Sequence, residues 1–166
     1  MANDPDNIII GPASVTIDGV AVGYTQGGVT LRKANEYVDV DADQAKGIVK
    51  KEITMEKLFV NFTMLESTLA NMQKAMSERA ADLWQGSALA FGSASPTIIE
   101  HTLVVTGDAP TASGFSTRTY TFTRAVHVDE VETMLGSRDT ATVIPVGFEL
   151  LKDQANGHRF GYVNSA

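Results

Sequence analysis

The sequence predicts a mainly β fold, a β-sandwich or partial barrel with one flanking α-helix. Apolar residues recur at every second position over most of the chain, and Gly, Asp and Pro separate the alternating runs. Helical spacing of apolar residues occurs in one segment only, near the middle of the chain. With 166 residues and a 43% hydrophobic composition, the chain can bury a core without disulfides or metals. We therefore expect a single domain over residues 1–166.

The first predicted element is a β-hairpin around the turn dipeptide Asp18-Gly19. Apolar and polar residues alternate on both sides of this dipeptide, as in two short paired strands. The apolar positions are Val15, Ile17, Val20 and Val22.

An N-terminal arm, residues 1–13, precedes this hairpin. It begins with polar residues, continues with the apolar triplet Ile8, Ile9 and Ile10, and ends near the breaker Gly11-Pro12. Such an arm can bind a neighbouring molecule, or its isoleucines can pack on their own domain, and both alternatives stay open.

Two strands are predicted next, at 29–32 and 37–41, after a turn at Thr25 to Gly28. The segment from about 41 to 51 is polar, contains Gly47 and lacks a core stripe, so we expect a projecting loop. A long strand follows over residues 52–66, because this run is rich in β-branched and aromatic residues. One face of this strand is defined by Leu58, Val60, Phe62 and Met64.

The single helix is predicted after Ser67, which can cap its N-terminus. Leu69, Met72, Met76 and Leu83 fall near helical spacing, and we interpret this stripe as core rather than as a ligand groove.

Three more strands complete the predicted sheet, at 97–106, 116–128 and 140–151. The last of these places alternate apolar residues on one face, and a tail over about 153–166 follows it. These alternate residues are Ile144, Val146, Phe148 and Leu150.

No pattern typical of catalysis or metal binding is present in the sequence. The chain has no cysteine, and its three histidines, His101, His127 and His158, stand alone in their segments. The acidic run Asp39 to Asp43 begins like a calcium loop, but Gln44 and Lys50 stand where that loop needs Gly and an acid. We therefore predict a non-enzymatic protein without catalytic residues, metal or cofactor.

The charge of the chain argues against tight binding of nucleic acid. The net charge is -7 and the sequence pI is about 4.8, whereas affinity for phosphates requires Lys and Arg. An acidic wall can still let a polyanion pass without sticking. The acidic N-terminus and the lack of long apolar runs also predict that the chain has no membrane anchor.

Between Gly28 and Met76 the sequence resembles phage major tail tube proteins, members of the tail tube and Hcp-like tube family. The resemblance lies in Gly-Gly-Val-Thr-Leu-Arg-Lys, an acidic Val-Asp-Val-Asp strand, a loop with Asp43-Gln44, and Phe62-Thr-Met-Leu-Glu-Ser-Thr-Leu-Ala-Asn-Met leading into the helix. It covers about a third of the chain.

The resemblance implies a structural virion protein that assembles with copies of itself. Six copies would form a ring with a continuous inner β-barrel, and the rings would stack into a tail tube that conducts double-stranded DNA into the host. Tape measure and tail-end proteins would be further partners. Assembly would occur in the cytoplasm of a host bacterium, and the mature protein would reside in the tail of the virion.

Two sets of residues follow from this resemblance. The projecting loop and the arm would contact an adjacent ring, while acids on alternating strand positions would face the lumen and repel DNA. The candidates for inter-ring contact are Ile8, Ile9, Ile10, Asp43, Gln44, Lys50 and Lys51, and the candidates for the lumen are Asp39, Asp41, Glu52 and Glu56.

Three alternatives remain open from the sequence. A tube protein of a contractile injection or secretion system would share the fold. A soluble β-sandwich binding module would need a groove of exposed aromatic residues, and the chain has one Trp, Trp84. An enzyme would require His101, His127 and an acid to meet in one cleft.

Overall fold

The computed structural model of the protein describes residues 9, 11–41, 47–78, 83–84, 88–89, 91–92, 96–128, 130–133 and 141–166. Over these residues the fold is mainly β with one α-helix, which confirms the predicted fold class at that level. The strands are β1 Ser14–Ile17, β2 Val20–Ala21, β3 Thr25–Asp41, β4 Ile48–Met64, β5 Leu83–Trp84, β6 Ala88–Leu89, β7 Glu100–Asp108, β8 Thr117–His127, β9 Ile144–Leu150 and β10 Tyr162–Ser165. The helix is α1 Leu69–Ala75, and a 3₁₀ turn spans Thr111–Ser113.

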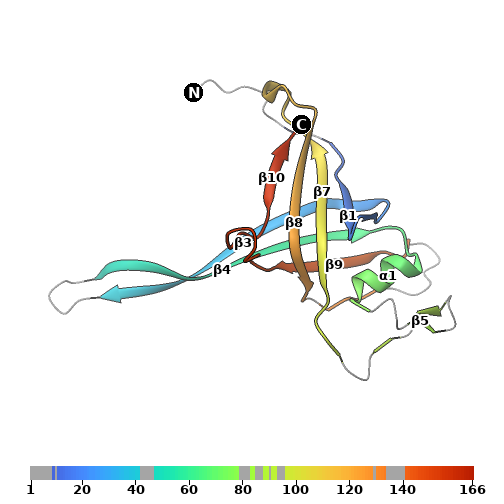
Figure 1. The fold of residues 1–166 in the computed structure, drawn as a ribbon, viewed down its shortest axis with the longest axis horizontal. Coiled ribbons are helices and arrows are strands. Elements are labelled where there is room, and N and C mark those ends of the chain that lie inside the picture. The colour runs from blue at the N-terminus through green and yellow to red at the C-terminus, as the bar shows by residue number, and fades with distance from the viewer. Residues whose placement is uncertain are drawn as a thin grey trace.

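One antiparallel sheet, in the order β2-β1-β7-β8-β9-β4-β3, contains every strand except β5, β6 and β10 along its path. Strand β8 branches, because Arg118 to Thr121 pair with β10 while Ala125 to His127 pair with β9. The two parts of the sheet cross steeply in Figure 1, with β7 and β8 running across β4 and β9. The sheet is not closed, since β2 and β3 end the strand order without pairing to each other.

The core lies between these two parts of the sheet and centres on Phe148. The Phe148 ring is fully buried and stacks on Phe62 at 6.2 Å between ring centroids. All four alternate residues predicted for the inward face of the last strand are buried, as expected from the period of two. The core cluster also includes Val15, Ile17, Val22, Val60, Met64, Ala75, Leu103, Val105, Phe122 and Ala125.

The predicted hairpin around Asp18-Gly19 is confirmed. Thr16 and Ile17 of β1 pair with Ala21 and Val20 of β2, which leaves a two-residue turn. Asp18 and Gly19 have φ angles of 53° and 78°, the left-handed values that a type I′ turn requires at both positions.

The prediction of two strands before a projecting loop is wrong. A single 17-residue strand, β3, runs from Thr25 to Asp41, and Gly27 and Gly28 form an irregularity inside it rather than a turn. Both glycines have a positive φ near 80°, so the backbone bulges there and pairing with β4 resumes at Thr30. Pairing with β4, whose residues are distant in the sequence, therefore outweighed the local turn pattern.

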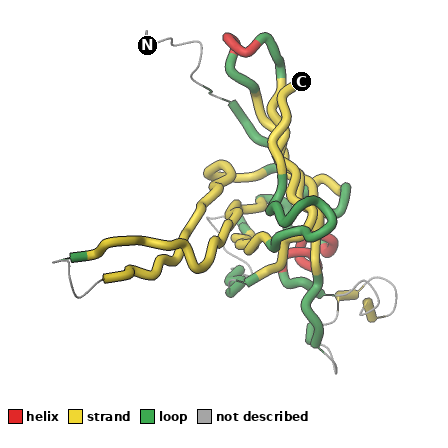
Figure 2. Tube along the Cα trace, turned by 60° about the vertical axis from the view of Figure 1, so that its left-hand side comes forward, coloured by secondary structure: helices red, strands yellow, loops and turns green. Residues whose placement is uncertain are grey.

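The predicted loop at 41–51 is wrong in part, because Ile48 to Lys51 belong to β4. Residues 42–46 lie outside the described residues. Strands β3 and β4 form a long hairpin that extends away from the body to the left in Figure 1 and stays clear of it in the turned view of Figure 2.

The helix is shorter than predicted, and only part of its predicted stripe packs on the core, since Met72 is half-buried against the core cluster. Thr68, not Ser67, is the N-cap, and its hydroxyl accepts a hydrogen bond from the Asn71 backbone N–H. The buried residues of α1 are Asn71 and Ala75, whereas Leu69 is exposed. The side-chain amide of Asn71 donates to the backbone carbonyls of Val22 and Glu66, each at 2.8 Å, and these hydrogen bonds offset the cost of burying it.

The C-terminal tail predicted over about 153–166 contains a strand, which corrects that interpretation. Strand β10 pairs with the first half of β8. The Ala166 carbonyl also accepts hydrogen bonds from the backbone N–H groups of Ser116 and Thr117, both at 2.9 Å. The paired residues are 41 to 47 positions apart in the sequence, so this pairing is not visible in the local pattern of the segment.

Candidate functional site

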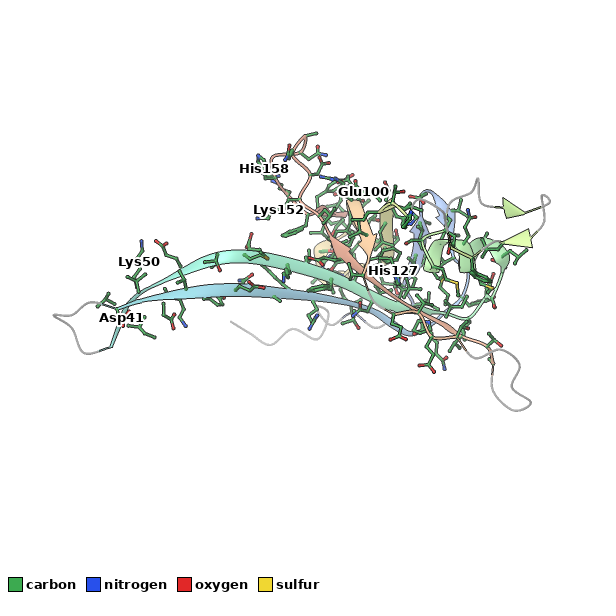
Figure 3. All side chains as sticks on the ribbon, turned by 90° about the horizontal axis from the view of Figure 1, so that it is seen from below. Asp41, Lys50, Glu100, His127, Lys152 and His158 are labelled. Carbon is green, nitrogen blue, oxygen red and sulfur yellow. The ribbon has the colours of Figure 1, made fainter. Side chains whose placement is uncertain are left out.

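The outer part of the β3–β4 hairpin concentrates apolar side chains that the described residues leave exposed. We call residues 37–41 and 47–55 the distal hairpin. Of 18 large hydrophobic side chains that are exposed in the described part of the chain, seven lie there. They are Tyr37, Val38, Val40, Ile48, Val49, Ile53 and Met55. In Figure 3 the labelled Asp41 and Lys50 mark the end of this projection, far from Glu100 and His127 in the body.

These apolar residues occupy both faces of the hairpin. Directly opposed residues of antiparallel strands share a face, and successive residues of a strand alternate between faces. Tyr37 opposes Ile53, whereas Val38 opposes Glu52 on the other face. Exposed apolar side chains on both faces indicate a segment that other surfaces enclose, because a hairpin that covers a core needs them on one face only.

The four acids predicted to face a lumen do not share one face of the hairpin. Asp39 opposes Lys51 and lies on the face that continues into the core, while Glu52 opposes Val38 on the other face. Glu56 lies on the same face as Asp39, because it opposes Asn35 and alternation in β3 places residues 35 and 39 together. A single surface of the hairpin therefore cannot present all four.

Lysines neutralise three of these four acids within the chain. The Asp39 carboxylate lies 3.2 Å from the Lys51 ammonium, and Glu52 pairs with Lys50. Lys50 and Lys51, predicted to meet an adjacent ring, thus already have partners in their own hairpin. Such exposed pairs contribute about 0–1 kcal/mol each and can exchange for intermolecular partners at little cost.

The remaining candidates for inter-ring contact are only partly covered by the structure. Ile9 is exposed, at 43% of its surface. Asp41, which was predicted to face the lumen, is exposed at the end of β3. Ile8, Ile10, Asp43 and Gln44 lie outside the described residues.

Glu56 joins the base of the hairpin to the C-terminal segment. Its two carboxylate oxygens lie 2.9 Å from Lys33 of β3 and 2.9 Å from Lys152, which follows β9. Hydrogen bonds from Lys33 and then Lys152 lower the pKa of Glu56 to about 2. Lys152 also lies over the Phe160 ring, 5.3 Å from its centroid. The hairpin is thereby held at its base while its outer part stays uncovered.

The segment over residues 31–58, which includes the distal hairpin, carries no net charge although the chain is acidic. Residues 31–58 contain six of the 13 Lys and Arg residues and six of the 20 acids, so the whole net charge of -7 lies outside this segment. Apolar side chains combined with balanced charge favour contact with another protein surface rather than with a polyanion.

His101 and His127 both contact the core ring of Phe148, which the sequence did not predict. Both imidazoles lie edge-on to the Phe148 ring, each at 5.9 Å between centroids. His101 is 6% exposed, and its Nδ1 lies 2.8 Å from an Asp18 carboxylate oxygen. The other Asp18 oxygen accepts from the Thr102 backbone N–H at 2.9 Å.

This contact fixes the β1–β2 turn on β7. Burial opposes ionisation of Asp18, but the hydrogen bonds from His101 and Thr102 outweigh it and lower the pKa of this carboxyl. Lys74 of α1 donates to the neighbouring Ile17 carbonyl. Because the two histidines pack against a core ring, their geometry fits a structural role.

The other sequence patterns lead to no second site in the part of the chain that the structure describes. No three His, Asp or Glu side chains gather there closely enough to hold a metal ion. No described helix is long and apolar enough to cross a bilayer.

Comparison with protein-family models and with curated proteins finds no match to this chain.

Proposed function

We propose that the chain is a structural subunit of a phage tail tube. In this proposal it is not an enzyme, and its work is to assemble with copies of itself. Copies join into rings, six to a ring as the family resemblance implies, and the rings stack around a channel for DNA.

The observation that carries the proposal is the uncovered apolar surface of the distal hairpin. A two-stranded hairpin is marginal in water without a third strand or a packed face. The described strand β3 nevertheless continues to Asp41, with apolar residues on both of its faces. Exposed apolar side chains that gather in one segment mark contact with another protein. A neighbouring subunit would supply the missing cover.

The open sheet supports the same proposal. Strand β3 is the last strand of the sheet order, so the backbone N–H and C=O groups of its outer edge have no strand partner in the described sheet. A long, open edge strand promotes pairing between chains. Pairing around a ring would satisfy these groups and continue the sheet from one copy to the next.

The charge distribution changes which acidic residues would repel DNA in this tube. Asp39, Glu52 and Glu56 each have a lysine partner. The acid excess outside residues 31–58 is then the main source of repulsion toward DNA. Double-stranded DNA would pass without tight binding, because the lumen would offer few free cations.

Negative-stain electron microscopy of the purified protein over a concentration series, paired with sedimentation velocity, tests the proposal. Rings or hollow filaments of uniform diameter are expected above a critical concentration. Seeds of preformed tail tips should lower that concentration if assembly requires an initiator. Compact monomers at every concentration, with and without seeds, would eliminate the proposal.

A further inference from the structure

A cationic hollow lies between the base of the β3–β4 hairpin and the C-terminal segment. Lys33, Lys152 and Arg159 line it, and Glu56 is the one carboxylate among its described lining residues. Glu56 pairs with Lys33 and Lys152, so the cations of the hollow exceed its acid by two charges. In a chain whose net charge is -7, this local surplus favours an acidic partner.

The cations of the hollow stay accessible in the folded chain. The side chains of Lys33 and Lys152 are 56% and 43% exposed, although both contact Glu56. Arg159 is exposed too, and no acid among the described residues pairs with it. Figure 3 shows Lys152 and His158, another lining residue, on the same side of the molecule. A carboxylate from outside can therefore approach these cations.

A segment with the complementary charge follows β8. Val131 packs against the core, while Glu130 and Glu132 on either side of it are exposed. The Thr133 hydroxyl donates to the Val143 carbonyl at 3.0 Å and holds the segment beside the start of β9. Neither glutamate forms an ion pair within the part of the chain that the structure describes. Two carboxylates at a fixed place thus match a surplus of two cations.

The acidic segment and the hollow lie near opposite ends of β9. Thr133 bonds to Val143, one residue before this strand, whereas Lys152 lies two residues after it. The seven residues of β9 extend about 20 Å, so the glutamates of one copy are too far from the hollow of the same copy to pair with it. A contact between two different surfaces of one chain is heterologous, and its repetition closes a ring when the rotation between copies permits.

We propose that Glu130 and Glu132 of one copy bind in the cationic hollow of the neighbouring copy, beside Lys152 and Arg159. This inference rests on the proposed function, since it supplies a contact between successive copies of the assembly. Charges at such a contact chiefly select the partner surface and fix the register. The apolar side chains of the distal hairpin then contribute area that the charges do not.

Charge exchange tests this contact. The variant Lys152→Glu/Arg159→Glu reverses the hollow, and the variant Glu130→Lys/Glu132→Lys reverses the segment. Each variant alone should raise the critical concentration for assembly about tenfold or more, because like charges then meet. An equimolar mixture should assemble at the wild-type concentration, since alternating copies bring opposite charges together again. A chain that carries all four changes should do the same. Light scattering and negative-stain images measure assembly, and urea unfolding checks that each variant is folded.

The segment variant separates a specific contact from a general effect of charge. Glu130→Lys/Glu132→Lys brings the net charge from -7 to -3, which by itself would favour association. Single variants that assemble at the wild-type concentration would overturn the contact, and so would a mixture that does not recover assembly. Both results would leave the proposed function in place. Wild-type protein that never assembles, with or without seeds, would eliminate the proposed function and the contact together.

Discussion

Removing apolar surface from the distal hairpin should block assembly without unfolding the subunit. The variant Val38→Thr/Val40→Thr/Ile53→Thr changes three side chains that are 44%, 40% and 53% exposed. Threonine keeps the β-branched shape and the strand preference but replaces apolar surface by a hydroxyl. Substitutions at such exposed positions change the free energy of unfolding by within about 0.5 kcal/mol each.

The effect on assembly follows from the surface that these side chains still expose. Full burial of such a side chain stabilises by about 1.5–3 kcal/mol, so covering the exposed fractions of all three contributes about 2–4 kcal/mol per subunit. At 1.4 kcal/mol for each factor of ten, losing this whole contribution would raise the critical concentration about 30- to 700-fold, and because threonine keeps one methyl group the lower end of this range is expected. Light scattering and negative-stain images over a concentration series measure this shift.

The matched control is Ile98→Thr/Val128→Thr, which alters two exposed side chains, 81% and 45% exposed, outside the hairpin and outside the strands of the sheet. Its critical concentration should equal that of the wild type. The reasoning would be refuted by a triple variant that assembles at the wild-type concentration while urea unfolding shows an intact fold. An equal loss of assembly in the control would also refute it, since the apolar surface of the hairpin would then have no special role.

Three further predictions concern the body of the subunit. Phe148→Ala should lower the free energy of unfolding by about 3–5 kcal/mol in chemical denaturation, because the ring is fully buried against Phe62 and leaves a cavity; a loss below 1 kcal/mol would place the core elsewhere. Asn71→Leu should cost about 1–3 kcal/mol by the same measurement, since it leaves the Val22 and Glu66 carbonyls without their donor, and an unchanged stability would show that these carbonyls find other partners. The pKa of Glu56 is lowered from 4.5 to about 2 in the folded chain, so its contribution to stability is complete above pH 4.5 and is lost as the pH falls toward 2. Glu56→Gln should therefore be less stable than the wild type at pH 7, and the difference should shrink as the pH falls through 2; a difference that stays constant from pH 7 to below pH 2 would contradict the ion pairs with Lys33 and Lys152.

The sequence did not predict much of the candidate site, and the reason is physical. A local pattern distinguishes apolar from polar positions, but it does not tell whether an apolar face meets a core or projects from the molecule. Ile48, Val49, Ile53 and Met55 were visible as β-favouring residues, and their density next to Gly47 was the available sign that strand pairing continues through the predicted loop. Their exposure became clear only once the other strands were in place.

The pairing of charges likewise depended on register. Asp39 alternates away from Val38 and Val40 in the sequence, as predicted, but the presence of Lys51 opposite it follows from bulges that shift β4 against β3. A shift of one residue would have moved every side chain to the other face. The acids that the sequence grouped for one lumen were therefore divided between two faces.

By itself, the sequence determined the mainly β fold, the turn at Asp18-Gly19 and the inward face of β9, because these depend on neighbours within a few residues. The tertiary structure alone decided the length of β3, the burial of Asn71, and the contact between Asp18 and His101, which are 83 residues apart. It also decided which surfaces stay uncovered. Each of these depends on hydrogen bonds and packing between distant segments, whose partners a local pattern does not contain.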